Sequence, residues 1–275
     1  MIMEQLMDKE SLMDGNHRTI VFHLPWALVK EEDYESELKN IGEWGVKELI
    51  APQYFYNPGR PYIFGFQKRA ERYGMKIAGA HGLLGPDYDL GCADDAALAE
   101  HVRYLEELSE VGIRTYTVHT GSHHEFFDGG KRVPSDFWPR LRHALDVLLP
   151  VAEKTGITLA VENIYEPLDI LDLTVSIVKS YRHSLLGLCF DSGHANISPA
   201  GLSAVFDRMK DNIVTCHLHD NDGTNDTHGA PGHGNIDWPA LMAKLLNLPR
   251  LIHLETESRE YSQSIWHTYE SLLRM

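Results

Sequence analysis

The stretch Thr215-Cys-His-Leu-His-Asp-Asn-Asp-Gly-Thr-Asn-Asp-Thr-His-Gly-Ala-Pro-Gly-His-Gly-Asn-Ile-Asp-Trp238 gathers metal-binding side chains at the end of an apolar run. Residues 212–216 are β-branched and apolar, which is typical of a buried strand, and polar residues begin where that strand should end. In a strand, His217 and His219 would share one face. A solvated loop is the alternative, but histidine and carboxylate residues also end other expected strands. The pattern therefore predicts a site at this strand end.

The whole chain contains eight apolar segments, each followed by a helical pattern. This order predicts eight strands that alternate with helices. Strands are expected at 18–24, 46–55, 75–81, 113–118, 157–161, 185–190, 212–216 and 251–255. Helices are expected at 31–44, the later part of 59–73, 94–111, 134–154, 169–181, 199–210, 239–246 and 259–274. Several strands are almost continuously apolar, which indicates a parallel sheet covered by helices.

A chain of 275 residues fits one closed (β/α)8 TIM barrel, which we expect at 17–275 after an acidic leader at 1–16. The alternative is an open doubly wound sheet. It is disfavoured because no Gly-x-Gly-x-x-Gly turn follows a strand, and because an open sheet would not bring all strand ends to one centre. Without a glycine-rich phosphate loop, no nucleotide cofactor is expected.

Composition limits the classes of partner. The formal charge is −15, from 25 basic and 40 acidic residues without a basic run, so extended contact with nucleic acid is not expected. Cys92, Cys189 and Cys216 form no Cys-x-x-Cys pair and are expected to be reduced thiols. The leader lacks a signal-peptide core and no segment approaches a membrane-spanning length, so a cytoplasmic location without membrane contact is expected.

Residues that can bind metals recur at the expected strand ends and in the loops that follow them. They are His81, His119, Glu162, Asp191, His194, His217, Asp226, His228 and Glu255. In a barrel these positions meet at the carboxyl end of the strands. Buried carboxylates repel one another unless a cation neutralises them, so the constellation predicts a divalent metal.

Five motifs resemble the xylose isomerase-like barrels, which include sugar isomerases and epimerases and the endonuclease IV branch. They are Val-Glu-Asn at 161–163, Phe-Asp-Ser-Gly-His at 190–194, His-Leu-His-Asp at 217–220, Gly-His-Gly-Asn-Ile-Asp at 232–237 and Leu-Glu-Thr at 254–256. The resemblance implies one divalent metal, Mn²⁺, Mg²⁺, Co²⁺ or Zn²⁺, on Glu162, Asp191, His217 and Glu255 in sugar-converting members. In the endonuclease branch it implies a three-zinc cluster that also uses His81, His119, His194, Asp226 and His228.

All nine positions are present, so the ligand set leaves both branches open. The negative charge and the loop at 221–226 favour sugar chemistry. Two departures from the family pattern are His233, where relatives often carry glutamate, and Gly223, near an arginine that binds substrate in some ketose epimerases. The first leaves the role of that loop open, and the second means that this substrate contact is not carried over.

The resulting hypothesis is a metal-dependent isomerase or epimerase of a small-molecule sugar or sugar phosphate. Glu162 and Glu255 are the expected acid–base pair, acting through an enediolate. Substrate contacts are expected from His81, His119, His194 and Trp26. The alternatives are a zinc phosphodiesterase acting on abasic DNA and a non-catalytic sugar-binding barrel. A homo-oligomer is also open, because barrels of this type often pair.

Overall fold

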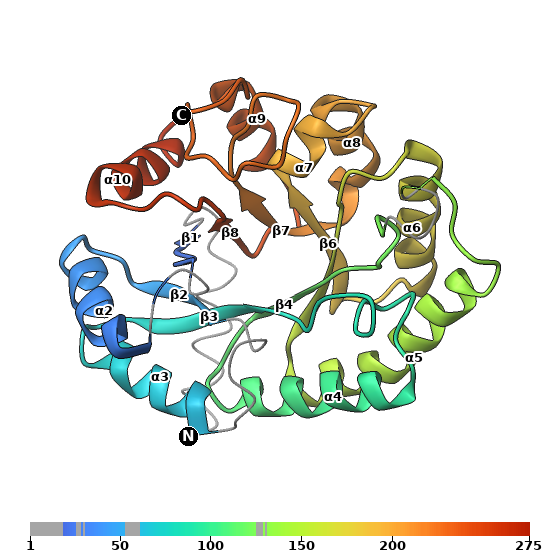
Figure 1. Ribbon diagram of the computed structural model, residues 1–275, viewed down its shortest axis with the longest axis horizontal. Helices are drawn as coiled ribbons and strands as arrows, with labels where there is room; N and C mark the ends of the chain where they lie inside the picture. Colours follow the sequence, from blue (N-terminus) through green and yellow to red (C-terminus); the bar gives the residue numbers. More distant parts are fainter. Residues whose placement is uncertain (1–18, 26–28, 30, 53–60, 125–128, 130) are drawn as a thin grey trace.

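The structure is a computed structural model that describes residues 19–25, 29, 31–52, 61–124, 129 and 131–275. Its centre is a ring of eight parallel strands, seen from one end in Figure 1. The strands are β1 (Ile20–Val21), β2 (Glu48–Ala51), β3 (Lys76–His81), β4 (Thr115–Val118), β5 (Thr158–Glu162), β6 (Leu186–Asp191), β7 (Ile213–Leu218) and β8 (His253–Thr256).

The sheet closes on itself. The hydrogen-bonded order is β1-β8-β7-β6-β5-β4-β3-β2, and a parallel bridge between Phe22 and Leu49 joins its two ends. At this seam the N–H of Phe22 donates to the carbonyl of Glu48 at 2.9 Å, and the N–H of Ile50 donates to the carbonyl of Phe22 at 3.0 Å. The predicted (β/α)8 barrel is confirmed, and no open sheet edge remains between these strands.

Helices surround the strands and form the outer layer in Figure 1. They are η2 (Glu31–Asp33), α2 (Tyr34–Glu43), α3 (Pro61–Glu71), α4 (Asp95–Ser109), α5 (Phe137–Thr155), α6 (Leu168–Tyr181), α7 (Ser192–Ile197), α8 (Leu202–Met209), η4 (Lys210–Asn212), α9 (Trp238–Leu245) and α10 (Gln263–Leu272). None of the helices in the described ranges combines the length and apolar character that a membrane crossing requires.

Helix boundaries follow local capping chemistry. The side chain of Asp94 accepts a hydrogen bond from the N–H of Ala97 at 2.9 Å and starts α4, and Gly156 ends α5 with a left-handed φ of 76°. The helix expected at 259–274 was placed too early, because Ser262 caps α10 through the N–H of Ile265. Helix α7 was not predicted, since its six residues are too short for a periodic pattern.

Side-chain alternation along β5 separates the outer core from the barrel interior. Leu159 and Val161 belong to the main core, whereas Ala160 packs with Cys189 and Val214 in a separate small cluster. Glu162 has the same parity as Ala160 and therefore points into the barrel at its carboxyl end. Cys189 and Cys216 are buried free thiols as predicted, and burial raises the pKa of both.

A partly buried ion pair lies at the opposite end of the barrel interior. Arg114 donates two hydrogen bonds to Glu48, at 3.0 and 2.6 Å, and also approaches Nδ1 of His253 at 3.1 Å. Burial raises the pKa of Glu48, but Arg114 outweighs that effect and the net pKa lies below its ordinary value. Glu48 is thus held as a carboxylate inside the barrel.

Replacing Arg114 with methionine is expected to lower the free energy of unfolding by about 2 kcal/mol, because it removes two charge-assisted hydrogen bonds to Glu48, which keeps Lys76 at 3.2 Å and Thr19 at 3.1 Å as partners. Urea denaturation measures the change. The control is Lys154→Met, which breaks an exposed pair with Glu106 and should cost only about 0–1 kcal/mol. Equal effects of the two substitutions would contradict this role of the partly buried pair.

Candidate metal centre

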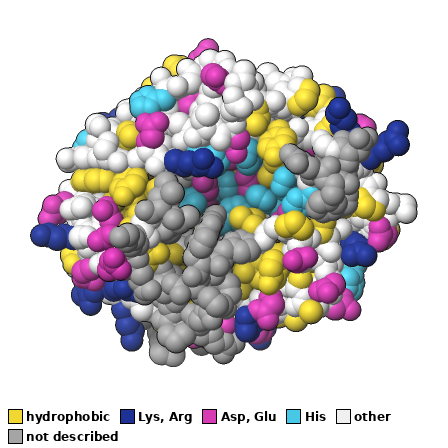
Figure 2. Space-filling model, in the orientation of Figure 1, with side chains coloured by type: hydrophobic (Ala, Val, Ile, Leu, Met, Phe, Trp, Pro, Cys, Tyr) yellow, Lys and Arg dark blue, Asp and Glu magenta, His cyan; other side chains and the backbone are white. Residues whose placement is uncertain are grey.

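A cavity of ≈ 480 Å³ opens at the carboxyl end of the barrel strands. Figure 2 shows the hollow in the middle of this face, with histidine and acidic side chains gathered inside it. The predicted site residues that line the cavity are His81, His119, Glu162, Asp191, His194, His217, Asp226 and His228. The barrel therefore brings together side chains from strand ends far apart in the sequence. Trp26 lies outside the described residues.

Glu162 lies at the centre of this group, close to four histidines, and is only 2% exposed. Its Oε2 atom lies 3.2 Å from Nε2 of His81 and 3.1 Å from Nε2 of His119. Its Oε1 atom lies 3.1 Å from Nδ1 of His217 and 3.4 Å from Nδ1 of His194. Burial raises the pKa of Glu162, but the charges of His217 and His119 outweigh burial and hold the pKa well below its usual range. Glu162 is therefore a carboxylate at neutral pH.

The Asp-Ser-Gly-His motif that follows β6 has a local structural basis. Oδ1 of Asp191 accepts the N–H of His194 at 2.7 Å, which caps α7 and turns the imidazole toward the cavity. Nε2 of His219 lies 2.9 Å from the same carboxylate, and Ser192 bonds the backbone of His219 through its hydroxyl. A side chain on Gly193 would overlap the ring of His219. The motif thus fixes a carboxylate and two imidazoles together.

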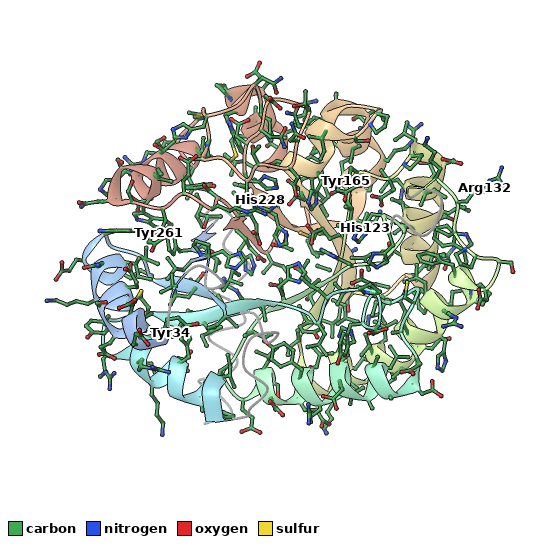
Figure 3. The ribbon with its side chains drawn as sticks, viewed as in Figure 1. Tyr34, His123, Arg132, Tyr165, His228 and Tyr261 are labelled. Atoms are coloured by element: carbon green, nitrogen blue, oxygen red, sulfur yellow. The ribbon has the colours of Figure 1, made fainter. Side chains whose placement is uncertain are left out.

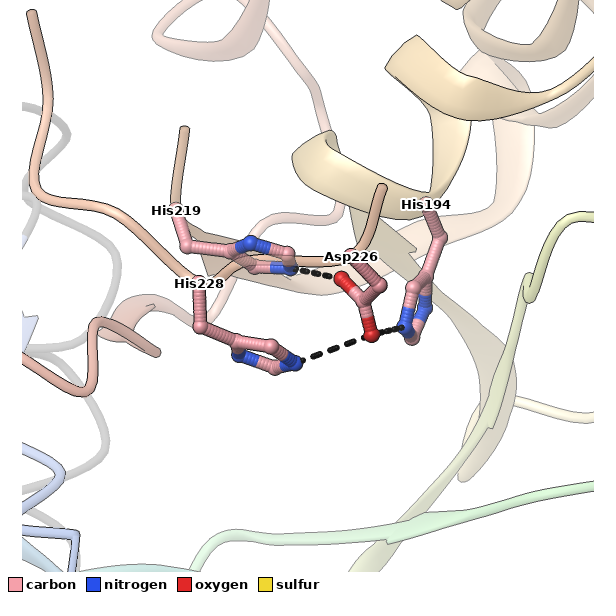
Figure 4. A group of neighbouring side chains, drawn as sticks. All are labelled: His194, His219, Asp226 and His228. Carbon is pink, nitrogen blue, oxygen red and sulfur yellow. Dashed lines mark hydrogen bonds and ion pairs between the residues drawn. The ribbon is translucent and has the colours of Figure 1, made fainter. Parts of the chain in front are cut away.

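A second group of ligand atoms lies beside the first and is drawn in Figure 4. Oδ2 of Asp226 lies 3.1 Å from Nε2 of His228 and 3.4 Å from Nε2 of His194. The rings of His219 and His228 stack, with centroids 4.0 Å apart and 6° between their planes. His228 has a left-handed φ of 50°, an uncommon conformation that tends to occur at functional sites.

The loop between β7 and α9 is held in place by Asp220. Its carboxylate accepts hydrogen bonds from the N–H of Gly232 at 2.8 Å, from the N–H of Ile236 at 3.2 Å and from the indole of Trp238 at 2.8 Å. These bonds return the loop toward β7, which brings Asp226 and His228 to the cavity. His233 is exposed and pairs with Glu260 at 2.8 Å, so this departure from the family pattern lies at the surface.

Glu255 lies deeper than the other predicted ligands and does not line the cavity. Its Oε1 atom accepts the hydroxyl of Thr215 at 2.9 Å and lies 2.8 Å from Nε2 of His253, while Oε2 lies 3.4 Å from Nε2 of His217. Burial raises the pKa of Glu255, but the nearby imidazoles of His217 and His253 keep the pKa below its ordinary value. Glu255 is therefore a buried carboxylate beside His217.

Sequence reasoning assigned no site role to several residues that the structure brings to the cavity region. Glu257 lines the cavity and lies 2.7 Å from Nδ1 of His23, which also lines it. Strand parity could have indicated Glu257, since it follows Glu255 by two positions. His219 follows His217 by two positions, just beyond β7, and is not among the predicted ligands. Its ring belongs to the second group.

The residues present fit a divalent metal. Ligand atoms lie within 4.8 Å of one another in three groups at the mouth, namely His81, Glu162 and His217; Glu162, Asp191 and His194; and His194, His219, Asp226 and His228. Three buried atoms in these groups make no hydrogen bond, namely Nε2 of His217, Nδ1 of His219 and Oδ1 of Asp226. Buried polar atoms normally have partners, and a cation bound between His194, His219 and His228 would satisfy Oδ1 of Asp226. Carboxylate and imidazole ligands suit Zn²⁺, Mn²⁺ or Co²⁺.

Comparison with known proteins assigns the barrel to a family. The model of the xylose isomerase-like TIM barrel family matches residues 48–272. The chain belongs to the xylose isomerase-like TIM barrel family. One relative is the uncharacterised protein y4fM of Sinorhizobium fredii. It is 30% identical over 99 residues, which are 36% of this chain and 30% of that protein. The chain therefore matches only about a third of that relative.

Another relative is fructoselysine 3-epimerase of Escherichia coli O157:H7, which is 24% identical over 211 residues, or 69% of this chain and 74% of that protein. A solved D-tagatose 3-epimerase-like protein superposes with a TM-score of 0.72 at 19% identity and covers 94% of this chain and 97% of its own. A family 2 AP endonuclease from Brucella melitensis superposes with a TM-score of 0.70 at 13% identity, over 93% and 99%. These superpositions show the shared fold.

Metal uptake by this xylose isomerase-like barrel is expected to strengthen with rising pH. Burial lowers the pKa of His228, but Asp226 and Glu257 raise it to about 9. A protonated imidazole cannot bind a metal, so at the group of His194, His219, Asp226 and His228 the metal must displace protons below this pKa. Affinity should rise by at least about tenfold per pH unit, because carboxylates also raise the pKa of His194.

Titrating metal-free protein with Zn²⁺ between pH 6.5 and 8.5 measures this trend. His228→Gln should reduce the slope, since one displaced proton is lost, whereas His267→Gln, which alters an exposed histidine on α10, should leave it unchanged. Affinity that does not vary with pH would contradict the proton competition.

Proposed function

We propose that this protein is a divalent-metal-dependent isomerase or epimerase of a small sugar or sugar phosphate. The observation that carries the proposal is the buried carboxylate of Glu162 in the wall of a cavity of ≈ 480 Å³. That volume suits a single small molecule. The similarity to fructoselysine 3-epimerase supports carbohydrate chemistry.

Glu162, Asp191 and His217 would hold the catalytic metal in this proposal, because Nδ1 of His217 lies 3.1 Å from Glu162 and 3.7 Å from Asp191. Glu255, the fourth predicted ligand, lies 3.4 Å from Nε2 on the other side of the ring, whereas Glu257 lies 3.9 Å from Nδ1. A divalent metal bound there would supply Lewis-acid polarisation of a sugar carbonyl, which makes the neighbouring C–H acidic.

The protein's own groups would then move the proton. Glu162, ionised and in contact with the cavity, takes the proton from the carbon next to the carbonyl and leaves an enediolate. In an isomerase, the Glu162 carboxyl group that has taken this proton would return it to the neighbouring carbon. In an epimerase, a second, protonated group would deliver a proton to the opposite face; Glu257 lines the cavity and is better placed for this than Glu255, the predicted partner, which does not. His81, His119 and His194 line the cavity, where they can orient substrate hydroxyls.

The test is product formation from a panel of ketoses and aldoses, free and phosphorylated, with the metal-loaded protein. NMR should identify an epimer or an aldose–ketose isomer of one member of the panel. Binding of a sugar without any conversion would instead support a non-catalytic sugar-binding barrel.

A zinc phosphodiesterase acting on abasic DNA is a second candidate, and the group of His194, His219, Asp226 and His228 favours it. This group would supply ligands for further metals, as a cluster that activates water for attack on phosphorus requires. The formal charge of −15 disfavours binding to the phosphates of a DNA backbone. Zinc-loaded protein that nicks an abasic duplex, with no sugar conversion, would select this alternative.

A further inference from the structure

A further cluster of potential ligands lies beside the metal centre and shares no residue with it. Asp89 stands in the loop that follows β3, and His123 and His124 stand in the loop that follows β4. Their ligand atoms all lie within 4.8 Å of one another, and Oδ2 of Asp89 is 2.9 Å from Nε2 of His124. Two loops thus bring one carboxylate and two imidazoles together.

One nitrogen atom of this cluster has no hydrogen-bond partner. Asp89 is only 1% exposed, and its Oδ1 atom accepts the N–H of Gly85 at 3.1 Å, which fixes the carboxylate. Oδ2 of Asp89 is paired with Nε2 of His124, but Nδ1 of His123, which is also buried, makes no hydrogen bond. Buried polar atoms without a partner are uncommon because each costs free energy. The unpartnered nitrogen of His123, beside a carboxylate and a second imidazole, therefore points to a missing cation.

Two structural roles that need no metal explain only part of this cluster. Asp89 could orient His119, but Oδ1 of Asp89 lies 4.0 Å from Nδ1 of His119, which is too far for a hydrogen bond. An ion pair between Asp89 and a protonated His124 would leave His123 unexplained. Burial and the charge of His119 lower the pKa of His123 to about 4, so His123 is neutral and keeps a lone pair for a metal.

The position of His123 connects this cluster to the mouth cavity, which it lines together with Tyr165. The rings of these two residues lie 6.1 Å apart, and the ring of His119 is 5.6 Å from that of His123. Figure 3 shows His123 beside Tyr165, with His228 on the opposite side of the mouth. A cation held here would face the same cavity as Glu162.

We propose that Asp89, His123 and His124 form a separate site for a divalent cation of the Zn²⁺ type in the wall of the cavity. One carboxylate and two imidazoles are a known ligand set for zinc, and three protein ligands leave a coordination position open. Because His123 lines the cavity, a hydroxyl or phosphate oxygen of a bound substrate could occupy that position. The site shares no residue with the proposed catalytic centre.

Crystals equilibrated with near-stoichiometric Zn²⁺ alone test the proposal by anomalous scattering. Wild type should show a peak at the cluster, with ligands at about 2.0–2.2 Å, and Asp89→Asn and His124→Gln should each remove it while the peak at Glu162 remains. The matched control is His143→Gln, which alters a pair with Asp95 that has the same 2.9 Å separation but is exposed. This variant should keep both peaks.

Two results would overturn the proposal. One is a peak at Glu162 with none at the cluster in wild type, which would leave Asp89 and His124 as a simple ion pair. The other is a cluster peak that survives both substitutions. Sugar conversion is a separate readout, so its failure would reject the proposed function without deciding this site.

Discussion

Glu162→Gln is expected to lower the rate of sugar conversion by about 10²–10⁴-fold, the usual worth of general acid–base catalysis. Glutamine has nearly the same shape and can still bond His81 and His119, which lie 3.2 and 3.1 Å from the carboxylate. It cannot accept the substrate proton, and it removes the negative charge that four histidines surround. The loss should therefore appear in kcat with the fold intact. Because Glu162 is also a proposed metal ligand, the variant is assayed at saturating metal and its bound metal is measured.

Steady-state kinetics with each variant checks this expectation, and circular dichroism confirms folding. The matched control is Glu166→Gln, because Glu166 is also buried but bonds the N–H of Ile164 at 2.8 Å and does not line the cavity. It should stay within a few-fold of wild type. A Glu162→Gln variant that is equally active would remove Glu162 from the mechanism.

His217→Gln is expected to weaken metal binding at the catalytic centre by at least about 100-fold, since loss of even a supporting residue often costs 10–100-fold. The imidazole of His217 is 2% exposed and stands between the carboxylates of Glu162 and Glu255. Glutamine removes the nitrogen ligand and leaves these buried charges to repel one another. Conversion of the sugar should fall together with bound metal.

Elemental analysis after dialysis against metal-free buffer measures the loss. His101→Gln is the control, because His101 is equally buried but bonds Tyr116 and the carbonyl of Tyr88, away from the mouth. That variant should retain its metal if it folds. Wild-type metal content in His217→Gln would show that the metal is held elsewhere.

The barrel could be predicted because its signal is repeated along the chain. Each of the eight strands carries apolar residues that pack outward, as Leu159 and Val161 do on β5, and each such pattern is local. Glu162, Asp191 and His217 were predictable for the same reason, since they end strands whose register is set by burial. The spatial convergence then followed from the closed sheet.

Loop residues were harder to predict. Asp89, His123 and His124 carry no periodic pattern, and their meeting depends on the tertiary path of two loops. His219 lies just beyond β7, so only the room left by Gly193 explains how its ring reaches Asp191. The depth of Glu255, compared with Glu257 at the cavity, reflects how far β8 extends and was not visible in the sequence.

The most direct test of the account is deuterium exchange from solvent into the converted sugar, measured with metal-loaded and metal-stripped protein. We predict exchange at a carbon next to the carbonyl that stops when the metal is removed and returns when it is restored. Exchange that continues without metal, or a metal-loaded protein that exchanges no sugar in the panel, would contradict metal-assisted proton transfer at Glu162.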